Sequence, residues 1–137
     1  MTKRSQCSAI LIAFGFTLCL LVIADRHHFW SPKMAVEPLS VDFGDVAATD
    51  DVRQEIVVKN TGRSSLVIDK VLPSCSSCIV IQSYPKEPIP SGKQGKIEFT
   101  LNISHMLGDV RTSFIIISNA KPQEIALVRV IANVLAE

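Results

Sequence analysis

Apolar and polar residues alternate along much of the chain beyond residue 35, and this period-two pattern predicts β-strands. The clearest example is residues 96–104, where every second residue is apolar and the residues between them are polar or charged. The apolar set is Ile97, Phe99, Leu101 and Ile103, and we expect it to face the core. A register slip of one residue would turn all of these side chains toward solvent, so the pairing of this strand is strongly specified.

Further strand signals lie on both sides of that segment, with turn residues between them. The first, residues 35–46, contains Pro38, which cannot donate to a ladder and therefore predicts an edge position. In the same segment Gly44 lies between apolar residues and predicts a bulge or bend. The remaining expected strands are residues 52–59, 66–72, 79–81, 111–118 and 124–135.

Two of these strands carry specific expectations about burial. In residues 66–72 the alternate positions Leu66, Ile68 and Leu72 are apolar, so we expect them to share the buried face. Residues 111–118 contain four consecutive apolar residues. A nearly continuous apolar run is typical of a strand that is covered on both faces, and we expect that here.

These segments predict an all-β domain over residues 35–137, because no helical period occurs after residue 30. About seven short strands separated by turn signals are typical of an Ig-like antiparallel β-sandwich. Residues 84–95 contain several prolines and glycines, which exclude a regular element there and predict a loop. We expect one hydrophobic helix before this domain.

The N-terminal block predicts a membrane segment. Residues 1–7 are short and basic, which places them in the cytoplasm. Residues 8–24 are uncharged and long enough for the lower limit of a membrane span, and residues 25–34 form a juxtamembrane linker. The apolar residues of the expected anchor are Ile10, Leu11, Ile12, Phe14, Phe16, Leu18, Leu20, Leu21, Val22 and Ile23.

Two interpretations of this block stay open. As an uncleaved signal anchor it gives a single-pass cell-membrane protein whose C-terminal domain lies outside the cytoplasm. As a signal peptide it would be cleaved near Ala24 and release a secreted or periplasmic domain. In both cases the domain leaves the cytoplasm.

Charge and composition exclude several classes of function. The 14 lysines and arginines nearly balance the 13 aspartates and glutamates, for a net charge of +1. These residues are scattered along the sequence, whereas nucleic-acid binding needs a clustered basic footprint. The sequence has no glycine-rich phosphate loop and no recognisable serine, histidine and acid arrangement. We therefore expect no enzyme activity, no catalytic residue and no cofactor.

The cysteine pair Cys75 and Cys78 is the main chemical signal. On the expected topology Cys7 faces the cytoplasm and Cys19 the lipid, so only this pair lies in an oxidising compartment. A structural disulfide requires the Cα atoms to lie within about 7 Å of each other. The alternatives are a redox-active pair, a copper site that also uses His105 or Met106, and two free thiols. Apart from that copper alternative we expect no metal site.

Several short motifs together resemble a known family. They are Phe43-Gly44-Asp45-Val46, Lys59-Asn60-Thr61-Gly62, Ser65-Leu66-Val67-Ile68, Ser74-Cys75, Ile89-Pro90-Ser91-Gly92 and Ser118-Asn119. In this order and spacing, over residues 36–134, the chain resembles exported bacterial Ig-like modules of unknown function, relatives of the Hydin-type and major-sperm-protein-type sandwiches. That family usually reads Ser-Cys-Gly-Cys-Thr, whereas this chain has one more residue between its cysteines. The resemblance implies an Ig-like sandwich outside the cytoplasm and no established reaction.

The resulting hypothesis is a non-enzymatic, membrane-tethered, extracytoplasmic Ig-like module for protein interaction or structural spacing. Its expected partners are the membrane, through the N-terminal helix, and an unidentified protein. We expect the protein partner to dock on the sheet edge opposite the Pro38 edge or on the loop of residues 84–95. The alternative function is thiol-redox or copper handling by Cys75 and Cys78.

Overall fold

A computed structural model describes residues 30–48, 51–104 and 106–136 of the chain. The chain divides into two compact units, Met1–Ser31 and Pro32–Glu137. The expected basic start, membrane anchor and most of the linker lie outside the described residues, as do Cys7, Cys19 and His105. Within the described ranges, no helix is long and apolar enough to span a bilayer.

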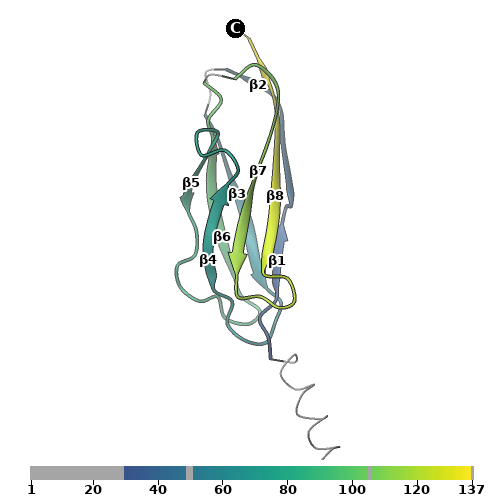
Figure 1. The fold of residues 1–137 in the computed structure, drawn as a ribbon, viewed down its shortest axis with the longest axis vertical. Coiled ribbons are helices and arrows are strands. Elements are labelled where there is room, and N and C mark those ends of the chain that lie inside the picture. The colour runs from purple at the N-terminus through teal and green to yellow at the C-terminus, as the bar shows by residue number, and fades with distance from the viewer. Residues whose placement is uncertain (1–29, 49–50, 105, 137) are drawn as a thin grey trace, which may run out of the picture. The chain divides into compact units, whose positions relative to one another are not determined.

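The second unit is built from eight strands in two four-stranded sheets (Figure 1). The first sheet has the order β1-β3-β6-β5 and the second the order β2-β8-β7-β4. The strands are β1 (Met34–Glu37), β2 (Ser40–Ala47), β3 (Val52–Asn60), β4 (Ile68–Pro73), β5 (Ile79–Ser83), β6 (Gln94–Leu101), β7 (Gly108–Ser118) and β8 (Ile125–Leu135). The all-β, two-layer expectation is confirmed.

One expected strand is in fact two strands, so the domain has eight strands where about seven were expected. Residues 35–46 break at Pro38, whose peptide bond with Glu37 is cis. Because proline interrupts the ladder, the chain leaves one sheet and enters the other. β1 pairs with β3 as an edge of the first sheet, as Pro38 predicted. β2 pairs in parallel with β8, so the sandwich is mixed and not wholly antiparallel.

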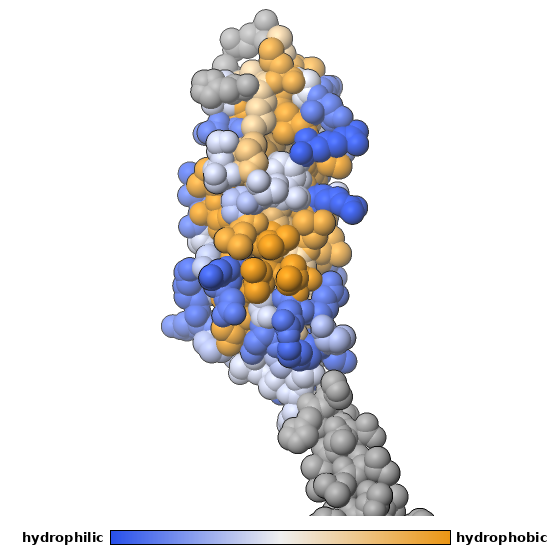
Figure 2. Space-filling model, in the orientation of Figure 1, coloured by the Kyte–Doolittle hydropathy of each residue, from blue (hydrophilic) through white to orange (hydrophobic). Residues whose placement is uncertain are grey.

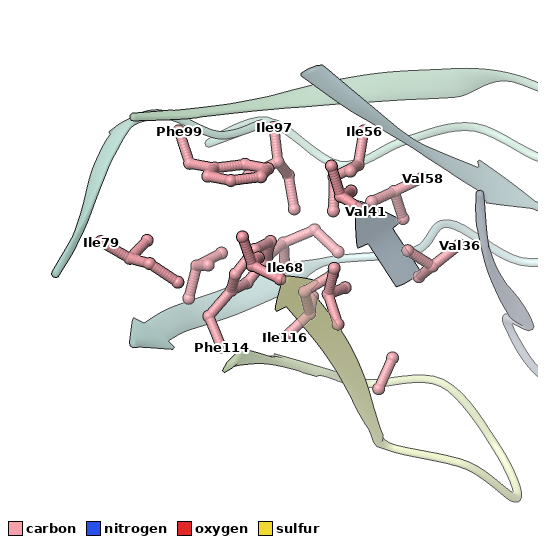
Figure 3. Close-up of a cluster of buried hydrophobic side chains, with 14 of the residues drawn as sticks. Val36, Val41, Ile56, Val58, Ile68, Ile79, Ile97, Phe99, Phe114 and Ile116 are labelled. Atoms are coloured by element: carbon pink, nitrogen blue, oxygen red, sulfur yellow. The ribbon is translucent and has the colours of Figure 1, made fainter. Parts of the chain in front are cut away.

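The core is a layer of aliphatic side chains between the sheets, centred on two phenylalanines (Figure 3). The rings of Phe99 on β6 and Phe114 on β7 lie 5.0 Å apart at an interplanar angle of 57°. Such tilted aromatic pairs add about 0.5–1.5 kcal/mol to the effect of burial. The alternate residues expected to face inward from residues 96–104 are all completely buried, so the predicted register is confirmed.

The expectation for residues 66–72 is correct at its beginning and wrong at its end. Leu66 and Ile68 are buried, but Leu72 is 45% exposed and Val71 is buried in its place. The ladder between β4 and β7 shifts between Ile68 and Lys70, where β4 carries one extra residue. A bulge of this kind inverts the alternation of inward and outward positions beyond it.

The expectation that β7 is covered on both faces is wrong. Phe114 and Ile116 are completely buried, whereas Ile115 and Ile117 are only partly buried. The reason is that no layer packs on the outer side of the second sheet within the described residues. The apolar run therefore supplies both the core and an outward surface.

Asn60 joins the loops at the end of the domain from which β4 begins. Its side chain is completely buried, and its Nδ2 donates to the carbonyl oxygens of Ser64 (2.8 Å) and Ile89 (2.9 Å). Its Oδ1 accepts from the backbone nitrogen of Gly62 at 3.0 Å. Leu66 and Ile89 also exchange two backbone hydrogen bonds. One side chain thus connects the turn after β3 to the loop of residues 84–95, which we call the proline-rich loop.

We expect Asn60→Ala to lower the free energy of unfolding by about 2–4 kcal/mol, because it removes the hydrogen bonds of a buried side chain and leaves the buried backbone nitrogen of Gly62 without this acceptor. Urea denaturation monitored by far-ultraviolet circular dichroism measures the change in unfolding free energy. The matched control is Asn102→Ala. Asn102 makes a similar local contact with Ser104 but at an exposed site, and its loss should cost less than about 1 kcal/mol. Equal losses in the two variants would contradict the role assigned to Asn60.

Gly95, near the start of β6, has no room for a side chain. A Cβ at this position would lie 2.4 Å from Cγ of Pro85 and 3.1 Å from Cδ1 of Ile89. We expect Gly95→Ala to destabilise the domain by about 1–3 kcal/mol through overpacking. A double-mutant cycle measured by thermal unfolding tests this clash. In the Pro85→Ala background, Gly95→Ala should lose most of its destabilising effect. Additive losses in the double variant would contradict the proposed clash.

Candidate functional site

An exposed apolar surface covers part of the outer side of the second sheet. We define the apolar face as Leu72 of β4, Ile115 and Ile117 of β7, and Ile125 and Leu127 of β8. Leu72 is paired across the ladder with Ile115, Ile115 with Leu127, and Ile117 with Ile125. Leu72, Ile125 and Leu127 are 45%, 51% and 44% exposed. Figure 2, which views this sheet from outside, shows apolar residues gathered at mid-height.

The outer side of the first sheet is charged by comparison. On β3 and β6 the outward positions include Arg53, Glu55, Lys96 and Glu98, all of which are exposed. Nζ of Lys96 donates to Oε2 of Glu55 at 2.8 Å. This hydrogen bond and the charge of Glu55 raise the pKa of Lys96. The first sheet thus has an ordinary solvated surface, whereas a contiguous apolar patch such as that of the second sheet often marks an interaction site.

A shallow pocket adjoins the apolar face. Its lining residues are Ser74, Arg111, Thr112, Ser113, Leu127, Arg129 and Ile131. Arg111 forms an ion pair with Asp109 at 2.9 Å. Arg129 is exposed and forms no ion pair with any residue of the described ranges. The pocket therefore combines an available guanidinium with hydroxyl groups beside aliphatic side chains.

All four sheet edges are short or irregular. β1 has four residues and is followed by Pro38, and β5 has five residues with a register shift between Ile81 and Ser83. The β2 ladder shifts between Asp42 and Asp45, around Gly44 at φ 62°, and β4 carries the bulge described above. Bulges and short edge strands hinder the addition of a partner strand. The edge expected to dock a partner, β5, shares this property.

The proline-rich loop, the other expected docking element, is closely held by the domain. Ile89 is buried, and Ser91 donates its hydroxyl to the carbonyl oxygen of Gly62 at 2.6 Å. Nζ of Lys86 lies 3.4 Å from the ring centroid of Tyr84, an arrangement that favours cation–π attraction. The exposed part of this loop carries no large apolar residue comparable to the apolar face.

Cys75 and Cys78 lie in the turn that takes the chain from β4 of the second sheet to β5 of the first. Their Cα atoms are 5.2 Å apart and their sulfurs lie within bonding distance. The carbonyl oxygen of Cys75 accepts from the backbone nitrogens of Cys78 (3.1 Å) and Ile79 (3.0 Å). This single hydrogen-bonded turn brings the two cysteines together, as a disulfide requires.

Redox and copper chemistry are the alternatives to a structural disulfide, and both depend on the surroundings of the cysteine pair. The turn leads directly into β5. Met106 packs against the core, and His105 lies outside the described residues. Within the described ranges no group of three or more histidine, cysteine, aspartate or glutamate side chains is arranged to hold a metal ion.

Comparison with known families identifies the domain. Residues 34–134 match the family described as "Protein of unknown function (DUF1573)". The chain belongs to the DUF1573 family. No curated protein matches the sequence.

Solved structures share the fold of this DUF1573 domain at low sequence identity. A protein of unknown function from Porphyromonas gingivalis W83 superposes with a TM-score of 0.68 and 14% identity, over 77% of this chain and 48% of that one. The Vibrio cholerae VesB protease gives 0.64 and 14%, over 74% and 32%. PapD-like domain 7 of human CEP192 gives 0.57 and 11%, over 78% and 88%.

These likenesses show an Ig-like sandwich fold that is shared with a PapD-like domain, and they show the fold alone. The chain spans about half the length of the Porphyromonas protein and about a third of the length of VesB. Identities this low show the fold alone, and a fold hosts many functions. The Hydin-type and major-sperm-protein-type relationships are not among these findings.

The sequence indicated the cysteine pair but not the apolar face or the arginine pocket. The apolar run in β7 predicts burial on both sides of the strand and not an exposed face. The signal that identifies the face is its combination with Ile125 and Leu127, which alternate with the buried residues Ala126 and Val128. Such apolar residues at outward positions of adjacent strands become informative only when the strand order is known.

We expect the Cys75–Cys78 pair to form a structural disulfide that pins the turn. In the chain-entropy model so small a loop contributes about 2 kcal/mol. The Cys75→Ser, Cys78→Ser double variant should lose up to that amount of unfolding free energy in urea, and dithiothreitol should lower the wild type to the same level. Complete reduction by a mild glutathione buffer without any change in stability would instead favour thiol exchange.

Proposed function

We propose that this DUF1573 protein is a non-enzymatic, membrane-tethered module outside the cytoplasm that binds a protein partner through the apolar face. The contiguous, exposed apolar surface on one sheet carries this proposal. Its side chains lie on three neighbouring strands that are joined by hydrogen-bonded ladders, so their positions are fixed before a partner arrives. A preorganised surface loses little conformational entropy on binding.

The opposite sheet provides an internal comparison. Both outer surfaces belong to the same domain and meet the same solvent, yet only one is rich in aliphatic side chains. Covering aliphatic surface contributes about 25 cal/mol per Å² removed from water, which favours docking on the second sheet. The apolar segment of residues 8–24 supports the proposed tether, and its basic flank supports an extracytoplasmic domain.

Photo-crosslinking in intact cells tests this function. A benzoylphenylalanine replacing Leu127 should give a discrete adduct with another protein. The matched control is the same replacement at Val80, which is 42% exposed on β5 of the first sheet, against 44% for Leu127. Val80 should give no such adduct. The adduct should also disappear when Leu72→Asp is added, because a carboxylate beside the contact opposes its desolvation.

Two outcomes would contradict the proposed interaction. The first is the absence of any adduct from position 127 while the protein is present at normal levels in the membrane fraction. The second is the same pattern of adducts from positions 127 and 80, which would indicate random encounters. The melting temperature of the Leu72→Asp variant shows whether its domain stays folded.

A further inference from the structure

The pocket beside the apolar face contains two arginines on adjacent strands. In the ladder between β7 and β8, Arg129 is paired with Ser113 and Arg111 is paired with Ile131. The two arginines are therefore diagonal neighbours across the ladder. Side chains as long as arginine can interact at that spacing. Both line the same pocket, together with Ser74 and Thr112.

One of the two positive charges of this pocket is not neutralised by the described residues around it. None of the residues that line it is acidic. Arg111 is paired with Asp109 of its own strand, whereas Arg129 forms no ion pair with another residue of the described ranges. The hydroxyl oxygens of Ser74 and Thr112 lie 3.2 Å apart and add polar groups at the same site. A guanidinium presents a planar fork that matches a carboxylate.

The arginine pocket and the apolar face are continuous. Leu127 belongs to the apolar face and also lines the pocket, and Arg129 follows it two residues later on β8. Successive outward positions on a strand are about 7 Å apart. An extended segment lying along β8 has the same repeat, so its alternate side chains can meet Leu127 and Arg129 in turn.

We propose that these two features together recognise an extended protein segment in which an aspartate or glutamate lies two residues from an aliphatic side chain. This inference rests on the proposed function, since it names the chemistry of the partner that docks on the apolar face. The aliphatic side chain packs on Leu127 and its neighbours Ile115 and Leu72. The carboxylate binds the guanidinium of Arg129, with Arg111 and the pocket hydroxyls beside it.

A second copy of this chain is less suited to the same surface. Around the outer side of the second sheet, Asp109 is paired with Arg111, and Asp45 accepts from Nδ2 of Asn133 at 2.8 Å. Asp42 accepts from the backbone nitrogen of Gly44 at 2.9 Å, and Asp69 is exposed on the edge strand β4. None of the residues that form the apolar face or line the pocket is acidic. Two such faces packed directly on each other would therefore bury Arg129 without a carboxylate from within the contact, and burying an unpaired charge is costly.

Selection from a library of short random peptides tests the proposed chemistry. The target is the full chain reconstituted in phosphatidylcholine nanodiscs, and the parallel targets are Arg129→Gln, Leu127→Asp and, as a control on the opposite sheet, Arg53→Gln. We expect peptides enriched in an acidic residue two positions from an aliphatic one. They should bind the wild type and Arg53→Gln equally, and neither of the other variants.

Synthetic versions of the selected peptides then give the decisive measurement. Replacing their acidic residue by its amide should weaken binding to the wild type by about tenfold or more, as expected for a charge-assisted pair. Binding to Arg129→Gln should be equally weak for the acidic and amide peptides. All variants should melt at the wild-type temperature, because the substituted side chains are exposed.

The outcomes separate this inference from the proposed function. Peptides that depend on Leu127 but lack a conserved acidic position would overturn the carboxylate inference and leave protein binding by the apolar face standing. Selection that yields nothing dependent on Leu127 or Arg129 would overturn both. Dimers abolished by Leu127→Asp, or Arg129-dependent binding to phosphatidylglycerol vesicles without peptide binding, would assign the surface to a second copy or to lipid and overturn the inference.

Discussion

The packing of two sheets against one layer of aliphatic side chains is the constraint on which the whole domain depends. Phe99 and Phe114 face each other at its centre, and the completely buried residues around them come from both sheets. Since successive side chains of a strand point to opposite sides, this layer occupies only alternate positions. The side chains at the other positions point outward. They are mainly polar or charged on the first sheet and include an aliphatic patch on the second.

The irregular parts of the domain fix the two ends of this layer. At one end the buried side chain of Asn60 satisfies backbone groups of two loops. At the other end the turn containing Cys75 and Cys78 leads from one sheet to the other, and the backbone nitrogen of Asn102 donates to the carbonyl oxygen of Cys78 at 2.8 Å. Buried loop backbone needs partners of this kind because it lies outside the ladders. Strand alternation alone would not position these connections.

The sequence predicted the parts of the fold that depend on local alternation. It placed Ile97, Phe99, Leu101 and Ile103 in the core and Pro38 at an edge, and the structure agrees. It failed where one residue changes the phase, because nothing local distinguishes the bulge before Lys70 from regular strand, and Leu72 was assigned to the wrong side. The residues that surround Arg129 could not be predicted from the sequence either, because the ladder between β7 and β8 brings them together.

The same geometry explains why binding is better placed on a face than on an edge. A partner strand added at an edge is held mainly by backbone hydrogen bonds, which every sequence can make. The four edges here are short or bulged, so that mode of association is hindered throughout the sandwich. A face, in contrast, presents only side chains, and its selectivity depends on their identity.

On the second sheet the ladder sets aliphatic residues from three strands beside an arginine without an ion-pair partner in the described ranges. Aliphatic contact alone would accept many partners, whereas in the proposed recognition Arg129 disfavours any partner that leaves its charge unpaired on docking. In this proposal the regular ladder supplies the rigidity of the surface, and one charged position within it supplies the discrimination between partners.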